Sequence, residues 1–269
     1  MAVPPSDVKS VPILRDKAHE AASEFTPESL LREARRQRGL REGRVPALCV
    51  LDPDGDIVRH LQATGGAQRD PDWACYHSEL HRFVAGGREF GIIGCAVGAP
   101  YAVLVAEQMF AAGCELLISI TSSGQITPLR SPPYFILIEA ALRDEGTSYH
   151  YLPASEFAQA PAELVAALAP ALTDVGEPVE RGTTWTTDAP YRETQAAIAA
   201  ARERGILAVE MEAAALYAFA QARGRPVLCF AHVTNQMGQA GDFEKGEANG
   251  ATAALRLVAA VANAWFAAR

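Results

Sequence analysis

The sequence predicts an α/β fold, with a single three-layer α/β/α domain around a mixed, twisted sheet. From Val45 onward, short apolar runs alternate with longer stretches of helical periodicity, and no internal repeat or long linker interrupts them. Several of the apolar runs are continuous, which is typical of strands buried on both faces. We therefore expect residues 26–269 to form one domain.

The expected elements follow in order along the chain. Strands are predicted at 47–51, 90–97, 116–120, 134–140, 206–209 and 227–233. Helices are predicted at 101–112, 161–172, 191–204, 212–223 and 251–268. In folds of this kind ligands bind beyond the carboxyl ends of strands, so the residues that directly follow each strand are the candidates for function.

The N-terminal region, residues 1–25, is polar and contains prolines, and we expect it to form an arm over the surface. A helix is predicted to begin directly after it, with Thr26 as the N-cap and Pro27 in the first turn. Leu30, Leu31 and Ala34 give this helix a partial apolar stripe, and its arginine-rich face is expected to be solvated.

The charge of the chain limits its partners. The 269 residues carry a net charge of −8, with a sequence pI of about 5.3, which disfavours binding to nucleic acid or to an anionic membrane. The first 17 residues contain no apolar run, so we expect no signal peptide. The apolar stretch 257–268 is shorter than the roughly 20 residues of a membrane-spanning helix. A cytoplasmic protein is expected.

Cysteine and histidine spacing predicts neither a metal site nor a disulfide framework. No CxxC pair occurs, and His77 and His81 lack the glutamate of an HExxH motif, so we expect both on a solvated helix face. His232 lies in an apolar strand and is expected to be a core histidine. Free thiols, mostly buried, in a reducing compartment are expected for Cys49, Cys75, Cys95, Cys114 and Cys229.

The most informative segment is Glu210-Met211-Glu212, where a predicted strand ends and a helix of small residues begins. Glu212 would lie near the helix N-terminus, where the helix dipole favours a carboxylate. An ionised carboxylate there can accept hydrogen bonds from both hydroxyls of a ribose. On spacing alone the commoner explanation is an ordinary first-turn glutamate next to a core methionine.

The segment VEMEAAAL resembles the ribose-binding signature of the nucleoside phosphorylase and nucleosidase superfamily, and the resemblance extends over most of the chain from about residue 46. It implies that Glu212 holds the ribose hydroxyls, that Met211 packs on the sugar, and that Glu210 is a further acid of the site. It also implies a nucleoside-phosphorylase-like fold and a homo-oligomer, either a dimer or a hexamer of dimeric units.

Residues 54–59 resemble the family's early phosphate loop, in which Gly55 allows backbone amides to approach an anion and Arg59 can bind it. Residues 94–100 resemble the family's glycine-rich turn. They do not form GxGxxG, so no dinucleotide site is predicted. The resemblance implies inorganic phosphate as co-substrate and no metal or organic cofactor.

Residues 118–124 match the family's next strand end, with Thr121 and Ser122 as candidate binding residues. Many phosphorylases have a phosphate-binding arginine at the position of Ser119 and a glycine at that of Thr121. Arg59, Arg130 and Arg143 are the candidates to compensate. The alternative is a hydrolase that uses water, because hydroxyls bind phosphate less strongly than a guanidinium does.

The base would face Tyr191, in a stretch that resembles the family's base pocket, and Asn235, at the end of the last strand. Purine-cleaving hexameric members usually have an aspartate at the position of Asn235. Asparagine cannot deliver a proton, but its amide can donate a hydrogen bond to a leaving base. A plain strand-end turn cap is equally compatible with Asn235. The uracil clamp of uridine phosphorylases is not recognisable.

The sequence therefore predicts a nucleoside phosphorylase, with Asn235 and Arg59 as catalytic residues. Its partners would be a small nucleoside and phosphate, with no nucleic acid and no membrane. Two alternatives stay open: a nucleosidase that hydrolyses the same bond, and a noncatalytic nucleoside-binding protein. The base, the sugar and the acceptor are not determined by the sequence.

Overall fold

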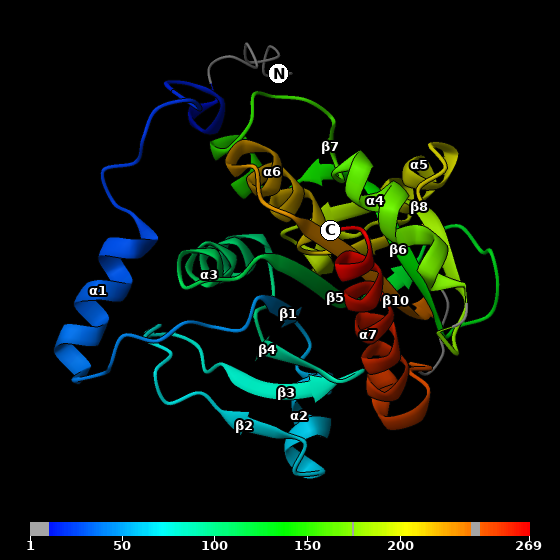
Figure 1. Ribbon diagram of the computed structural model, residues 1–269. Coiled ribbons are helices and arrows are strands. Elements are labelled where there is room, and N and C mark those ends of the chain that lie inside the picture. Colours follow the sequence, from blue (N-terminus) through cyan, green and yellow to red (C-terminus); the bar gives the residue numbers. More distant parts are fainter. Residues whose placement is uncertain (1–10, 174, 238–242) are drawn as a thin grey trace.

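A computed structural model describes residues 11–173, 175–237 and 243–269 (Figure 1). Within these residues, ten strands form one mixed sheet. The strands are β1 (Leu48–Asp52), β2 (Ala67–Arg69), β3 (His81–Ala85), β4 (Arg88–Gly94), β5 (Leu116–Gln125), β6 (Tyr134–Asp144), β7 (Phe157–Gln159), β8 (Val179–Thr187), β9 (Ala208–Glu210) and β10 (Val227–Gln236). The α-helices are α1 (Pro27–Arg38), α2 (Asp56–Ala63), α3 (Ala99–Ala111), α4 (Ala162–Leu168), α5 (Gln195–Glu203), α6 (Ala213–Arg223) and α7 (Ala251–Ala267).

Strand β5 is the centre of the sheet. It pairs in parallel with β1 and β10 and antiparallel with β9. The strand order β10-β6-β8-β9-β5, together with the direct pairing of β10 with β5, closes these five strands into a ring. The remaining strands extend the sheet from β5 in the order β1-β4-β3-β2. The expected α/β fold with a mixed sheet is confirmed. The sequence did not predict that five of the strands close into a ring.

The helices lie in groups around this sheet (Figure 1). Helix α3 packs against α1 and α6, and α7 packs against α2 and α4. The main hydrophobic core lies between these helices and the strands. A smaller cluster, which includes Trp185, Ile198 and Ile206, lies beneath α5.

The short strand β9 determines where the Glu210-Met211-Glu212 segment lies. Ala208 pairs with Gln125 and Val209 with Gly124 in antiparallel register, so β9 runs back along the end of β5. Glu210 and the residues after it are therefore delivered beside Thr121 and Ser122 rather than beyond the end of the sheet.

Several predicted elements need correction. Strand β8 was missed, as were the short strands β2, β3 and β7 and the helix α2. The predicted helix 191–204 is in fact the short 3-10 helix η5 (Pro190–Arg192) followed by α5. His77 and His81 are not on a helix, because His77 lies in a loop and His81 is buried in β3.

The helix predicted at 251–268 is confirmed as α7, and the 3-10 helix Glu247–Gly250 directly precedes it. Residues Glu247–Ala267 form a helical segment that by length and composition alone could cross a membrane. In the structure Leu257, Val258 and Val261 of α7 are buried in the main core. This segment is thus the core helix of the domain.

The segment before α1 lies against the loop that follows β6. The 3-10 helix η2 (Pro12–Leu14) is its only regular element among the described residues, and residues 1–10 of the predicted arm lie outside them. Lys17 Nζ lies 3.1 Å from His150 Nδ1, and His19 Nε2 lies 3.2 Å from the Tyr149 carbonyl oxygen. The predicted cap of α1 is confirmed, since Thr26 Oγ1 accepts a hydrogen bond from the Ser29 backbone N–H.

Candidate active site

Glu210 organises the start of α6 from the end of β9. Its carboxylate is buried and accepts four hydrogen bonds, from the hydroxyls of Thr184 and Thr186 and from the backbone N–H groups of Glu212 and Ala213. Burial raises the pKa of Glu210, and these donors act in the opposite direction. Because the four donors occupy both oxygens, Glu210 holds the backbone of its neighbours.

Glu212 is the N-cap residue of α6, and its carboxylate crosses to the N-terminus of α3. The side chain is buried, with Oε1 accepting the Gly98 N–H at 2.7 Å. Burial raises its pKa to about 8, the charge of Glu210 adds to this, and hydrogen bonds from Gly98 and Thr121 oppose it. A carboxylate held in this way, beside a helix N-terminus and a hydroxyl, can accept hydrogen bonds from a diol once it is ionised.

The turn between β1 and α2 is fixed by the buried Asp52. Its two oxygens accept the backbone N–H groups of Gly55, at 3.1 Å, and Val58, at 2.9 Å. Burial raises the pKa of Asp52 to about 7. Gly55 has a φ of +78°, and a Cβ there would lie 2.7 Å from both Arg59 Nη1 and Cys95 Sγ. The turn thus requires glycine both for its backbone conformation and for its close contact with the turn after β4.

Arg59 lies over this turn and is largely exposed. Its Nη2 donates to Asp56 Oδ1 and to the Asp54 carbonyl oxygen, both at 2.7 Å. Lys245 Nζ binds the other oxygen of Asp56 at 2.5 Å. The Sγ of Cys95, which is exposed while the other four cysteines are buried, lies 3.9 Å from Arg59 Nη1. Two cations therefore lie at the mouth of the turn, both paired with one carboxylate.

A carboxylate that the sequence analysis did not single out joins this turn to β5. Asp54 Oδ2 accepts the Ser122 backbone N–H at 2.6 Å, and Asp54 Oδ1 accepts the Ser122 hydroxyl at 2.5 Å. The charge of Asp54 also helps to raise the pKa of Asp52 and of Glu212. These contacts join five residues into one continuous polar cluster, which we call the Glu212 cluster: Asp54, Gly98, Thr121, Ser122 and Glu212.

Asn235 lies at the same edge of the sheet. It pairs with Gly124 of β5 in the register of β10 and is partly buried. Its Nδ2 lies 3.9 Å from Met237 Sδ, the last residue before a gap in the described chain. The neighbouring His232 is buried and stacks on Phe135, with the ring centroids 4.7 Å apart. This places the predicted base-facing residue on the strand that adjoins Thr121 and Ser122.

Comparison with known families shows where this arrangement belongs. The family model of the Phosphorylase superfamily matches residues 52–263. The chain belongs to the Phosphorylase superfamily. The match begins at Asp52, at the end of β1, and includes every residue of the Glu212 cluster.

Relatives of the superfamily with curated names are phosphorylases. A uridine phosphorylase of Thermococcus kodakarensis is 28% identical over 220 residues, which cover 71% of this chain and 79% of that protein. A DeoD-type purine nucleoside phosphorylase of Colwellia psychrerythraea is 28% identical over 153 residues, which cover 56% of this chain and 65% of that protein. The predicted family and the predicted class of enzyme, a pentosyltransferase, are confirmed.

Solved structures of the superfamily share the fold. A uridine phosphorylase of Vibrio fischeri ES114, complexed with 6-hydroxy-1-naphthoic acid, gives a TM-score of 0.71 at 18% identity and covers 87% of this chain and 99% of that one. A purine nucleoside phosphorylase of Toxoplasma gondii, in complex with immucillin-H, gives 0.70 at 19% identity and covers 83% and 93%. At these identities the likeness establishes the fold.

The position that the sequence resemblance matched to a phosphate-binding arginine, Ser119, lies inside the sheet. Ser119 is 1% exposed, and it lies in β5 between Leu51 of β1 and Cys229 of β10. Its hydroxyl has no hydrogen-bond partner among the described residues. At the position where the resemblance implies a phosphate-binding arginine in many phosphorylases, this chain thus has a small buried side chain.

Three residues that the sequence suggested for binding base or phosphate lie away from the Glu212 cluster of their own chain. Tyr191 lies on η5 and is 99% exposed. Arg130 pairs with Glu180 on the surface. Arg143 is buried and holds the loop after β6, and its guanidinium donates to Ser148 Oγ, Ser155 Oγ, Pro153 O and Leu152 O. Roles for Tyr191 and Arg143 in binding substrate stay predictions.

Sequence reasoning missed Asp54, Lys245 and the pair Thr184 and Thr186. The two threonines lie two apart on β8, so they share one face of the strand and both reach Glu210. That period of two was visible in the sequence. Lys245 carried no signal, because it approaches Asp56 across 189 residues.

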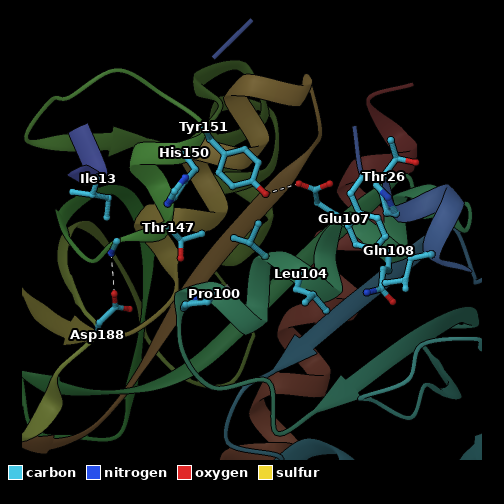
Figure 2. A pocket seen from close by; sticks show the side chains of 15 residues that line it. Ile13, Thr26, Pro100, Leu104, Glu107, Gln108, Thr147, His150, Tyr151 and Asp188 are labelled. Carbon is cyan, nitrogen blue, oxygen red and sulfur yellow. Dashed lines mark hydrogen bonds between the residues drawn. The ribbon is translucent and has the colours of Figure 1, made fainter. Parts of the chain in front are cut away.

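A cavity of about 560 Å³ lies apart from the Glu212 cluster, between the N-terminal segment, α3 and the loop after β6 (Figure 2). Figure 2 shows Tyr151 donating a hydrogen bond to Glu107 at the wall of the cavity, with Leu104 and Gln108 on the same helix, α3. None of the cluster residues is among those that line it in the described chain. The cavity thus shares one wall, α3, with the Glu212 cluster, because Gly98 of the cluster is the N-cap residue of that helix.

Proposed function

We propose that this protein cleaves the N-glycosidic bond of a nucleoside and transfers the pentosyl group to inorganic phosphate. The observation that carries the proposal is the buried carboxylate of Glu212, held beside Gly98 and beside Thr121 of β5. Membership of the Phosphorylase superfamily supports it, as do relatives named uridine, guanosine and purine nucleoside phosphorylase.

The proposed chemistry assigns one task to each side of the site. Glu212 binds the ribose hydroxyls while Met211 packs on the sugar, which stabilises the oxocarbenium-like transition state. The acceptor approaches the anomeric carbon from the side of Gly55, Arg59 and Ser122. As its oxygen bonds to that carbon, the C–N bond breaks and its electron pair leaves with the base. Asn235 donates a hydrogen bond to the departing base.

Water is a second candidate acceptor, and a specific contact favours it. The two donors of Ser122 already bind the carboxylate of Asp54, and Ser119 stands where many phosphorylases have an arginine. Water needs no such anion donors, so hydrolysis of the same bond is compatible with this site.

A panel of purine, pyrimidine and modified nucleosides, assayed for free base with and without phosphate, tests the proposal. Phosphate-dependent release together with pentose 1-phosphate supports the phosphorylase. Equal release without phosphate identifies a hydrolase. Saturable nucleoside binding with no release from any member of the panel would indicate a noncatalytic binding protein and refute both reactions.

A further inference from the structure

The contact between Asp54 and Ser122 has an unusual chemistry for a site that is proposed to accept an anion. A backbone N–H and an adjacent hydroxyl that point the same way are the donors with which proteins bind phosphate oxygens. In this chain both donors of Ser122 are bound by the two oxygens of one carboxylate, at 2.6 and 2.5 Å. Asp54 therefore occupies these donors as a phosphate would.

The surrounding charges do not compensate. Asp54 belongs to a turn that also holds Asp52 and Asp56, and the two cations at this turn, Arg59 and Lys245, are both paired with Asp56. The charge of Asp54 is also felt at Glu212, whose pKa it helps to raise. A phosphate dianion at Ser122 would lie beside the negatively charged carboxylate of Asp54, which would repel it. Strand β5 supplies no guanidinium to offset this repulsion, because its residue 119 is a small, buried serine.

We propose that Asp54 determines which acceptor can bind. Its carboxylate competes with inorganic phosphate for the two hydrogen-bond donors of Ser122, so phosphate must displace the carboxylate in order to bind there. The effect of Asp54 on catalysis rests on the proposed function. The competition between Asp54 and phosphate for Ser122 does not, because it concerns binding alone. It makes Asp54 a specificity-determining residue and predicts weak phosphate binding in the natural protein.

Asp54→Asn is the sharpest variant for a test. Asparagine keeps the size of aspartate but offers one acceptor oxygen, so at least one Ser122 donor is freed and the negative charge is lost. Glu244→Gln is the matched control, because Glu244 is an exposed acid beside Lys245 and its removal changes the net charge equally without touching Ser122. Asp54→Ser serves if the asparagine variant does not fold, as judged by circular dichroism.

The first measurement is the Kd of inorganic phosphate by equilibrium dialysis, which requires no activity. We expect Asp54→Asn to lower this Kd at least tenfold and Glu244→Gln to change it less than twofold. Adding Ser122→Ala to Asp54→Asn should reverse most of the gain, because the freed hydroxyl is then absent. A change below threefold in Asp54→Asn, or an equal change in Glu244→Gln, would overturn the proposal.

The second measurement is base release from the nucleoside that the panel identifies, with phosphate titrated at constant ionic strength. Asp54→Asn should lower the phosphate KM at least tenfold and raise the ratio of phosphate-dependent to phosphate-independent release, with the nucleoside KM altered less than threefold. If no nucleoside is cleaved by any variant while the dialysis result holds, the proposed function fails and the role of Asp54 stands. If cleavage occurs and the phosphate KM is unchanged, the role of Asp54 fails alone.

Discussion

One oxygen of Glu210 accepts the backbone N–H of Glu212 at 2.7 Å, so the first acid of the motif sets the position of the second. The same oxygen also accepts the Ala213 N–H at 2.7 Å. These two N–H groups belong to the cap and first residue of α6, where backbone donors otherwise lack partners. Glu210 is therefore a positioning residue, while Glu212 directs its own carboxylate toward Gly98.

Above about pH 8, where Glu212 is ionised, Glu212→Gln should lower kcat/KM for the nucleoside about tenfold or more, because a hydrogen bond to an ionised group contributes roughly 1.5–3 kcal/mol. The fold should persist. With a pKa of about 8, the Glu212 carboxyl is protonated near neutral pH, and the glutamine side chain has a similar size and the same lack of charge. In the natural protein kcat/KM should rise as the pH rises through about 8 and Glu212 ionises. Steady-state kinetics between pH 6 and 9 check this, and unchanged kcat/KM in the variant would contradict the ribose role.

Thr186→Val should destabilise the protein by roughly 1–3 kcal/mol, because it removes a donor to Glu210 and leaves the buried Ala214 N–H without its acceptor. Thr184→Val is the matched comparison. It removes a single hydrogen bond to Glu210 and should cost only about 0.5–1.5 kcal/mol. Urea unfolding measures both, and an equal loss in the two variants would argue against the role of the Thr186 hydroxyl at Ala214.

Arg59→Ala should raise the phosphate KM far more than the nucleoside KM if phosphate is the acceptor. Arg59 lies over the Gly55 turn, where its guanidinium can exchange its contact with Asp56 for a phosphate oxygen. Arg36→Ala, which removes a surface arginine paired with Glu33, is the control. Base release that is equally fast without phosphate and unaffected by Arg59→Ala would favour the hydrolase.

His232 should make the protein less stable in acid. Burial, with a contribution from Lys245, lowers its pKa to about 4 from a usual value near 6.5, so the folded protein holds the ring neutral. Stability from this group is present above pH 6.5 and is lost as the pH falls toward 4, by about 3 kcal/mol in total. His232→Gln should flatten the free energy of unfolding over this interval. A parallel decline in both proteins would show that other groups cause the loss.

A homo-oligomer is expected, either a dimer or a hexamer of dimeric units. Val97 and Leu104, which lie on either side of the α3 N-terminus, are apolar and 52% and 40% exposed. Neighbouring subunits would cover such side chains at least in part. Sedimentation at micromolar concentration should give a mass above that of the 28.7 kDa chain, and a monomer alone would contradict this.

Much of the fold was predictable because its buried strands are continuous apolar runs. Strands β5, β6 and β10 begin where the apolar runs begin, although each continues further than predicted. Strand β8 was missed because its sequence, VERGTTWTT, carries charge and hydroxyls and is buried mainly near its end. Closure of the ring had no local signal, since it depends on the pairing of β5 with a strand about a hundred residues later.

Part of the site was predictable from the position of its residues directly after the predicted strands and from their resemblance to a known family. The carboxyl-end rule and the VEMEAAAL resemblance pointed to Glu212, Ser122 and the Gly55 turn, and the structure brings these segments together. Asp54 was not predicted, although it directly precedes Gly55. Its contact with Ser122 spans 68 residues, and a sequence shows a carboxylate without showing which donors it meets. The roles of Arg143 and Tyr191 stay predictions: within one chain Arg143 binds the loop after β6 and Tyr191 is exposed.

The ring of strands also affects the order in which the protein can form during synthesis. Strand β5 carries Thr121 and Ser122, but its ring neighbours are β9 and β10, which emerge from the ribosome much later. Until Val227–Gln236 has been synthesised, one side of this apolar strand has no partner. Contacts between such distant segments fold slowly, and unpaired strands aggregate. The same pairing that assembles the cluster therefore leaves an apolar strand of the unfinished chain unpaired on one side until β10 is made.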